Sequence, residues 1–317
     1  MEHNPDTPPK GLICPLVTPL KRGTRLDTTA LEKLIRHVGP SVDGILLGDM
    51  IYGEGEALDI KTRLDLFSSG LDLIGGKWPV FLTITSKNRR ETANIRELAE
   101  ATVKRMDYSG PLFWFDTPIY YHGNRGLPGW YQSILQQTAF GILLANRPEW
   151  VKHSKPLIKH KNVRTHVFKK IAAIKQVKGL VFSGSVKRSI HYRKAAGIRR
   201  DFRFYDIDEY AFMKQPSTHG VVAVGANLLS EAWQTVTASC LNTHEVQNSD
   251  DRRQILETAG MLETCYMLYI HNPPALLKRL LQIVGVLPSD DLAPGTLAAT
   301  EEQKRQAEYF CRKYRLA

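Results

Sequence analysis

The chain of 317 residues is 43% hydrophobic, which is enough for the core of one large domain or two modest ones, and it carries a net charge of +11. It has no apolar run of about eighteen residues, and its amino-terminal segment is polar and rich in proline, so we expect neither a membrane span nor a signal peptide, and a cytoplasmic location. The four cysteines are scattered without the spacing of metal ligands, so we expect reduced thiols and neither a metal nor a cofactor.

Eight short apolar runs recur along the chain, most of them about thirty residues apart. They are residues 11–20, 44–50, 79–85, 111–119, 141–146, 171–177, 202–208 and 220–227. The runs are continuous and do not alternate with polar residues, which predicts strands that are buried on both faces, as in a parallel sheet.

The segments between these runs have the periodicity of helices. Residues 28–38 place four apolar side chains on one stripe, with Asp27 or Thr28 as the N-cap, and residues 60–74 and 91–106 behave similarly. Strands that alternate with helices in this way predict a TIM (β/α)8 barrel. The alternative is a doubly wound open sheet, but that fold usually has fewer strands and a glycine-rich phosphate loop, and the first strand here ends in VTPLKRG.

The last part of the chain is predicted to be helical. We expect the barrel to span residues 1–228 and a C-terminal helical region to span 229–317, with a helix that begins at Pro273–Pro274. This region is too apolar to stay unpacked, so we expect it to pack on the barrel or at a subunit interface.

Lys175 is the main candidate for chemistry. It stands near the end of the sixth apolar run, in IAAIKQVKG, where lost hydration disfavours the ammonium form and leaves a nucleophilic amine. Such an amine forms Schiff bases with carbonyl substrates. The alternative is a lysine that extends from a strand end to solvent. Because the active site of a TIM barrel lies at the carboxyl ends of its strands, we favour the catalytic interpretation.

The order of several motifs resembles the dihydrodipicolinate synthase / N-acetylneuraminate lyase family of class I aldolases, over about residues 11–310. PLVTPL (15–20) resembles the family's first strand, and YGEGEAL (52–58) its Gly-Thr-Thr-Gly-Glu loop. DTPIYYHG (116–123) resembles its Pro-Tyr-Tyr motif and LLANRP (143–148) its Tyr-Asn-Val-Pro motif. IAAIKQ (171–176) resembles the Gly-Ile-Lys-Glu strand that carries the Schiff-base lysine. The resemblance therefore implies a lyase or aldolase in which Lys175 attacks pyruvate or another 2-oxo acid.

The chain also departs from the family pattern. Ala145 stands in place of the tyrosine that relays protons, and Trp150 in place of an arginine that binds a substrate carboxylate. The loop GDMIYGEGE (48–56) is longer than the family loop and lacks both threonines that bind the 2-oxo acid. These departures argue against dihydrodipicolinate synthase activity itself.

Other residues can be proposed as substitutes. Tyr121 is the second catalytic candidate, and the candidate substrate contacts are Tyr52, Gly53, Tyr120 and Asp206. Each has a structural alternative: Tyr52 as an aromatic residue of the rim, the tyrosine pair as a subunit contact, and Asp206 or Asp208 as a helix N-cap.

Residues 150–200 contain fifteen lysines and arginines and no acidic residue, whereas the rest of the chain holds 28 basic and 32 acidic side chains. This segment could steer an anionic substrate or bind nucleic acid, or it could be a solvated helix face. We favour the solvated face or modest steering, because predicted strands interrupt the segment and no aromatic pairs are interleaved with its basic residues.

The leading hypothesis is thus a Schiff-base lyase acting on a 2-oxo acid, in a homodimer or homotetramer as the resemblance implies. The alternative is a catalytically impaired barrel that binds a small-molecule ligand or a protein partner.

Overall fold

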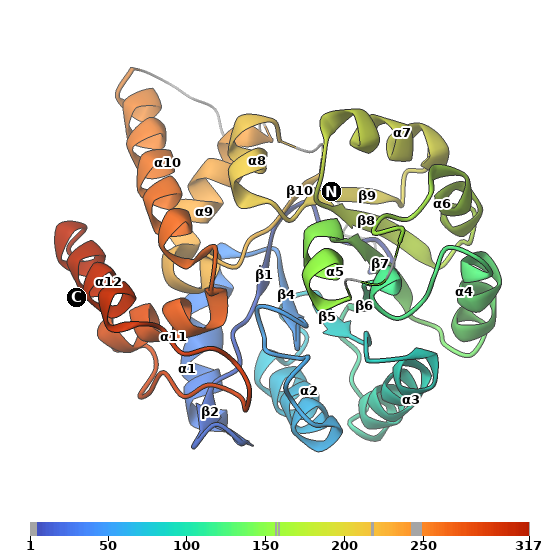
Figure 1. Cartoon of the computed structure of the whole chain (residues 1–317), viewed down its shortest axis with the longest axis horizontal. Coiled ribbons are helices and arrows are strands. Elements are labelled where there is room, and N and C mark those ends of the chain that lie inside the picture. Colours follow the sequence, from blue (N-terminus) through green and yellow to red (C-terminus); the bar gives the residue numbers. More distant parts are fainter. Residues whose placement is uncertain (1–4, 156, 158, 217–218, 242–248, 317) are drawn as a thin grey trace.

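The structure, a computed structural model, describes residues 5–155, 157, 159–216, 219–241 and 249–316. Eight parallel strands form a closed barrel surrounded by helices, which confirms the predicted TIM barrel (Figure 1). Around the barrel, β1 is followed by β4 and then by each strand in turn to β10, which pairs with β1. The strands are β1 (Gly11–Pro15), β4 (Gly44–Leu47), β5 (Val80–Thr83), β6 (Leu112–Asp116), β7 (Gly141–Asn146), β8 (Val177–Phe182), β9 (Arg203–Asp206) and β10 (Gly220–Val222).

The helices that cover the barrel begin and end close to the predicted positions. The segments predicted as helices at 28–38 and 60–74 are α1 (Thr28–Val38) and α2 (Ile60–Ile74), and Asp27 caps α1 by accepting a hydrogen bond from the Ala30 amide at 3.1 Å. The others are α3 (Arg89–Arg105), α4 (Leu127–Leu135), α5 (Pro148–Ser154), α6 (Thr165–Ala172), α7 (Val186–Ala196), α8 (Glu209–Lys214) and α9 (Ala226–Cys240). A short hairpin of β2 (Leu20–Lys21) and β3 (Arg25–Leu26) precedes α1.

Large apolar side chains fill the inside of the barrel. Because successive strand residues point to opposite faces, each strand contributes alternate residues to the interior and to the layer beneath the helices. Phe81 and Phe113 stack in this interior with ring centroids 5.3 Å apart. The buried interior cluster consists of Ile13, Leu46, Phe81, Phe113, Phe115, Leu143, Ala145, Val181, Tyr205, Ile207 and Val222. Its contents are therefore almost wholly hydrocarbon and aromatic.

The predicted position of the sixth strand is wrong. The strand is β8, whereas the run predicted as a strand at 171–177 holds the end of α6, the turn that follows it and only the first residue of β8. Val167, Phe168, Ile171 and Ala172 are the buried stripe of α6. A short apolar run looks the same at the end of a buried helix as in a buried strand, which explains the error.

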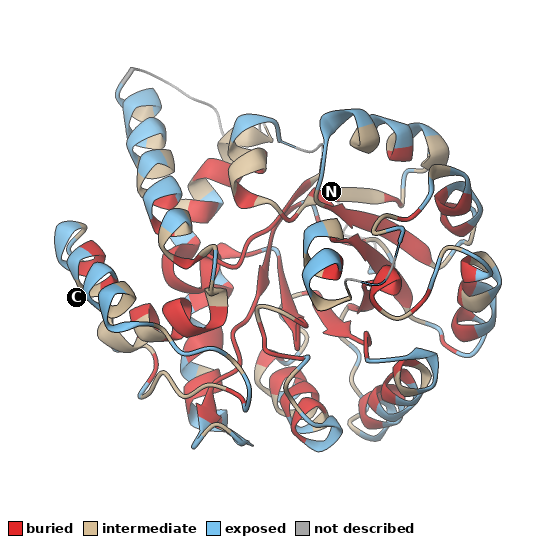
Figure 2. Cartoon of the chain, viewed as in Figure 1, coloured by how far each residue is buried: buried red, intermediate tan, exposed pale blue. Residues whose placement is uncertain are grey.

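Three further helices, α10 (Ser249–Tyr269), α11 (Pro273–Ile283) and α12 (Glu301–Lys313), pack against one another, and α10 and α11 also pack against α9 (Figures 1 and 2). The boundary predicted between residues 228 and 229 falls inside α9, where Leu229 has non-helical angles. Because α9 packs against α1 and β1, we place this helix with the barrel. Among the described residues, no helix combines the length and the apolar composition needed to cross a membrane.

Candidate functional site

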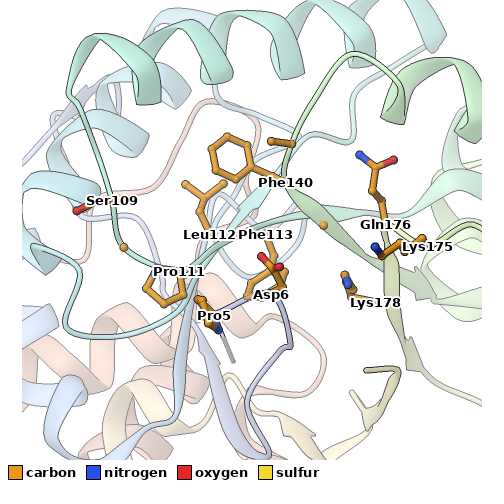
Figure 3. Close-up of a pocket in the computed structure, with 13 residues that line it drawn as sticks. Pro5, Asp6, Ser109, Pro111, Leu112, Phe113, Phe140, Lys175, Gln176 and Lys178 are labelled. Atoms are coloured by element: carbon orange, nitrogen blue, oxygen red, sulfur yellow. The ribbon is translucent and has the colours of Figure 1, made fainter. Parts of the chain in front are cut away.

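Lys175 does not lie at the barrel mouth, which we define as the end where the strands have their carboxyl ends. It is an exposed residue of the turn that leads from α6 into β8, two residues before the strand begins. This is the opposite, amino-terminal end of the barrel. A hollow of about 400 Å³ lies there, with Lys175, Gln176 and Lys178 on one side and Ser109 and Pro111 on the other (Figure 3). The expectation that Lys175 faces the mouth is therefore wrong.

At the mouth, the ends of β7 and β8 carry two small hydrocarbon side chains. In β8, Gly179 and Leu180 match the Gly-Ile of the strand motif, so Val181 takes the place that the resemblance gives to the lysine. Its partner across the strand pair is Ala145, which takes the place of the tyrosine. Both residues are buried in the barrel interior. Neither side chain can act as a nucleophile or transfer a proton.

A buried ion pair takes up part of the mouth instead. Arg147, directly after β7, donates through Nη1 to Oδ2 of Asp49, after β4, at 2.6 Å, and the two side chains are 4% and 0% exposed. The guanidinium lies over the ring of Tyr52 at 4.8 Å from its centroid. Burial alone would lower the pKa of Arg147, but Asp49 and Tyr52 outweigh it and raise the pKa. Burial raises the pKa of Tyr52 to about 12, so its hydroxyl stays protonated.

Aromatic rings extend this cluster across the rim. Trp150 lies 5.9 Å from the Arg147 guanidinium and stacks on Tyr120, with ring centroids 4.4 Å apart. The Tyr120 hydroxyl donates to Glu56 at 2.6 Å. A hollow of about 520 Å³ lies beside this stack, lined by Trp150, Glu56 and segments of the C-terminal region. The structure thus brings Tyr52 and Tyr120 to the mouth, joined through Arg147 and Trp150.

Tyr121 belongs to a different cluster. Its hydroxyl donates to Asp116 at 2.7 Å, and Asp116 also accepts hydrogen bonds from Tyr131 at 2.6 Å and Thr85 at 2.7 Å. Burial raises the pKa of the Asp116 carboxyl, although these hydrogen bonds favour its ionised form. Asp116 lies between strand positions that point inward, so by alternation this network lies outside the barrel interior. The structure gives Tyr121 a set of fixed partners and does not place it beside Lys175.

Gly53 and Asp206 also have local structural surroundings. Gly53 lies in the turn after β4, where its carbonyl accepts from the Thr18 hydroxyl at 2.7 Å, and a Cβ atom there would come within 2.9 Å of the Asp49 amide. Asp206 lies between Tyr205 and Ile207, which point into the barrel, so its own side chain points away from the interior. The helix cap at this strand end is Asp208, which accepts from the Ala211 amide at 3.0 Å.

One titratable group near the mouth was not predicted. Glu209, the first residue of α8, is buried, and its carboxylate accepts hydrogen bonds from the Gly225 amide at 2.8 Å and from the Tyr269 hydroxyl of α10. Burial raises the pKa of Glu209 to about 7, and the hydrogen bonds from Tyr269 and Gly225 oppose this rise. Glu209 therefore connects the barrel to the C-terminal helices through a group that titrates near neutrality.

The sequence did carry a signal for the buried ion pair. Asp49 and Arg147 are charged residues that follow the ends of two completely buried strands, within one or two positions. Charged groups at that place face the mouth of a TIM barrel. Among the described residues, no three His, Cys, Asp or Glu side chains are grouped as metal ligands would be.

Comparison with known proteins agrees with the fold and with the motif order. The sequence model of the Dihydrodipicolinate synthetase family matches residues 8–312. The chain belongs to this family. The family consists of class I aldolases and lyases.

Individual relatives are distant. The chain is 22% identical over 307 residues to a 4-hydroxy-tetrahydrodipicolinate synthase of Bdellovibrio bacteriovorus, which covers 94% of this chain and 96% of the relative. A dihydrodipicolinate synthase variant described as monomeric superposes with a TM-score of 0.81 at 20% identity, over 99% of both chains. YagE, a prophage protein of the dihydrodipicolinic acid synthase family from E. coli K12 in complex with pyruvate, superposes with a TM-score of 0.77 at 16% identity, over 97% of this chain and 99% of that one. At such identities the structural likeness establishes the fold.

Proposed function

We propose that this family member binds a small carboxylate ligand at the barrel mouth without forming a Schiff base. The observation that carries the proposal is the pairing of Ala145 with Val181 at the ends of β7 and β8. Schiff-base chemistry needs an amine within reach of the substrate carbonyl and a group that moves protons. In the described chain, none of the eight barrel strands has a lysine among its last two residues.

Arg147 supports a carboxylate as the ligand. Its Nη1 is bound to Asp49, whereas its Nη2 is buried without a hydrogen bond of good geometry among the described residues, although the Tyr52 side chain also interacts with the guanidinium. A buried donor without an acceptor costs about 1–3 kcal/mol, and a ligand carboxylate would supply the acceptor. The nearest hollow to be tested for such a ligand is the one beside Trp150, whose ring centroid lies 5.9 Å from the Arg147 guanidinium; Arg147 itself does not line it. YagE, the structural neighbour in complex with pyruvate, makes 2-oxo acids the first ligands to test.

The test combines trapping with binding. Borohydride reduction in the presence of pyruvate and a panel of other 2-oxo acids should leave the intact mass unchanged, while calorimetry should detect binding of at least one of them. Arg147→Lys keeps the charge but loses the planar fork of donors and should weaken binding about tenfold or more. Lys152→Met removes an exposed cation of the nearby α5 and should leave binding unchanged. Equal affinity of all three proteins, or no binding by any 2-oxo acid, would refute the proposal.

A Schiff base on Lys175 is the competing function. It is favoured by the hollow that Lys175 lines together with Lys178 at the amino-terminal end of the barrel. A covalent adduct that disappears in Lys175→Ala would establish a Schiff base on Lys175 and would refute non-covalent binding at the mouth as the function. Self-association in the manner of the family stays a prediction, which sedimentation velocity can test.

A further inference from the structure

The basic segment of the sequence forms one side of the folded barrel. Residues 150–200, with fifteen cationic and no acidic side chains, include α6, α7 and the part of α5 that follows Glu149. The helices α6 and α7 pack side by side (Figure 1). A barrel helix normally has both signs of charge on its solvent face, so two neighbouring helices without an acidic residue call for a separate explanation; the adjoining carboxylate of Asp201 is bound by Lys178 and Arg199.

The exposed cations of these two helices and of the turns that follow them form what we call the basic face. None of them has an ion pair among the described residues, in contrast to Lys178 and Arg199, which both bind Asp201. Cations in a last helical turn are favoured by the helix dipole, which accounts for some of them but not for those outside it. The basic face consists of Lys169, Lys170, Lys175, Lys187, Lys194 and Arg200.

Aliphatic side chains are exposed among these cations. Val186 and Ile190, one helical turn apart on α7, are 54% and 46% exposed, and Ile198, just after α7, is fully exposed. Tyr192 is the single residue of α7 that is buried. An exposed aliphatic row on a helix that buries so little of itself points to a partner with an apolar layer.

The side chains that accompany the cations of the basic face indicate whether its anionic partner is a nucleic acid or a membrane. Nucleic acids are held by cations together with aromatic rings that stack on bases, or by polar groups that reach base edges. In the described part of the segment, Phe168, Phe182 and Tyr192 are buried, and Trp150 is engaged with Tyr120. Cations beside exposed aliphatic residues are instead the combination that binds the interface of an anionic membrane.

We propose that the basic face docks on the surface of an anionic phospholipid bilayer. Val186, Ile190 and Ile198 would enter the boundary between headgroups and acyl chains, and the surrounding lysines would lie against the anionic headgroups. This role is independent of what the barrel mouth binds.

Vesicle co-sedimentation of the full chain tests the proposal. The protein should sediment with vesicles of phosphatidylcholine and phosphatidylserine but not with phosphatidylcholine alone. Raising the salt from about 50 to 300 mM should weaken binding at least about tenfold, because it screens the charges at the surface. Absence of sedimentation with the anionic vesicles would overturn the proposal.

Two variants with the same net charge show whether vesicle binding depends on the basic face or only on the total charge of the protein. Lys187→Glu/Lys194→Glu should weaken vesicle binding about tenfold or more. Lys33→Glu/Arg105→Glu, on exposed positions of α1 and α3, has the same net charge and should bind vesicles much more tightly than the first pair. Equal losses in both would show that only net charge matters and would overturn the proposal.

A third variant tests the aliphatic contribution and the nucleic-acid alternative. Ile190→Ser/Ile198→Ser changes only exposed side chains and should weaken vesicle binding several-fold. Unchanged vesicle binding by this variant would show that no apolar insertion occurs and would contradict the proposed mode. Retention of duplex DNA or single-stranded RNA in place of vesicles would make the face a nucleic-acid site and refute the lipid proposal.

Discussion

The buried ion pair of Arg147 and Asp49 makes a quantitative prediction. Replacing Arg147 by methionine keeps an apolar stem of similar length and leaves the Asp49 carboxylate buried without its cation. Removing one partner of a buried pair costs about 3–5 kcal/mol. Asp49 would keep two hydrogen bonds, from the amides of Ile51 at 3.0 Å and Tyr52 at 2.9 Å, which offset part of the loss. We therefore expect Arg147→Met to cost about 3 kcal/mol of the free energy of unfolding, at the lower end of that range.

Urea unfolding followed by circular dichroism measures this cost, and a double-mutant cycle isolates the pair. Asp49→Asn removes the charge with little change of shape and should be destabilising alone, because it leaves Arg147 buried without a carboxylate. The double variant Arg147→Met/Asp49→Asn should lose clearly less than the sum of the two single changes. A loss below about 1 kcal/mol in Arg147→Met would show that the pair behaves like an exposed one and would refute the reasoning.

Three other predictions concern groups that the structure fixes. Burial raises the pKa of Glu209 to about 7 from an ordinary 4.5. The folded state therefore holds this proton more tightly, and a contribution of about 2–3 kcal/mol is present in full below pH 4.5 and lost as the pH rises through 7. Glu209→Gln should remove this part of the stability difference between pH 5 and pH 8, and an unchanged pH dependence in urea unfolding would contradict the assignment. Lys278→Met leaves Glu54 buried without its cation and should cost about 3–5 kcal/mol by urea unfolding, with a smaller loss when Glu54→Gln is added. Tyr121→Phe removes one donor to Asp116 and should cost about 1–2 kcal/mol in the same assay. Calorimetry should find ligand affinity unchanged in this variant, and a large loss of affinity would restore Tyr121 as a site residue.

Local sequence patterns determine most of this fold and could be recognised without the structure. The helices α1 and α2 were predicted over their whole lengths from an apolar stripe at helical spacing, which for α1 agrees with the predicted cap at Asp27. Seven of the eight barrel strands were predicted near their places, since continuous apolar runs between helices leave few other folds.

The wrong position predicted for the sixth strand also misplaced the main catalytic candidate, Lys175. Ile171 and Ala172 continue the helical stripe that begins at Val167 and Phe168. The seven residues 171–177 taken alone are too few to show this helical periodicity. The shift of six residues moved the strand from Val177 to Ile171 and carried Lys175 from one end of the barrel to the other. A position at the barrel mouth depends on strand register, which a motif of four residues does not determine.

The mouth also contained interactions that no local pattern specifies. Arg147 and Asp49 are 98 residues apart in the chain, and their contact arises only when the barrel closes and brings β4 and β7 together at one end. The same holds for Glu209, whose partner Tyr269 comes from a helix sixty residues further along. Sequence could identify charged residues near strand ends as candidates, but pairing them required the three-dimensional arrangement.

Val181 and Ala145, at the places where the resemblance puts a lysine and a tyrosine, are compatible with the barrel fold. A lysine at the end of β8 would place an amine in the apolar barrel interior, and the loss of hydration would cost stability that only catalysis justifies. Valine and alanine at these places extend the hydrocarbon interior and leave no buried polar group to satisfy. Part of the remaining polarity of the mouth lies in Arg147 and Asp49, which neutralise each other. A Schiff base at the mouth would require an amine there, and the ends of these two strands carry none.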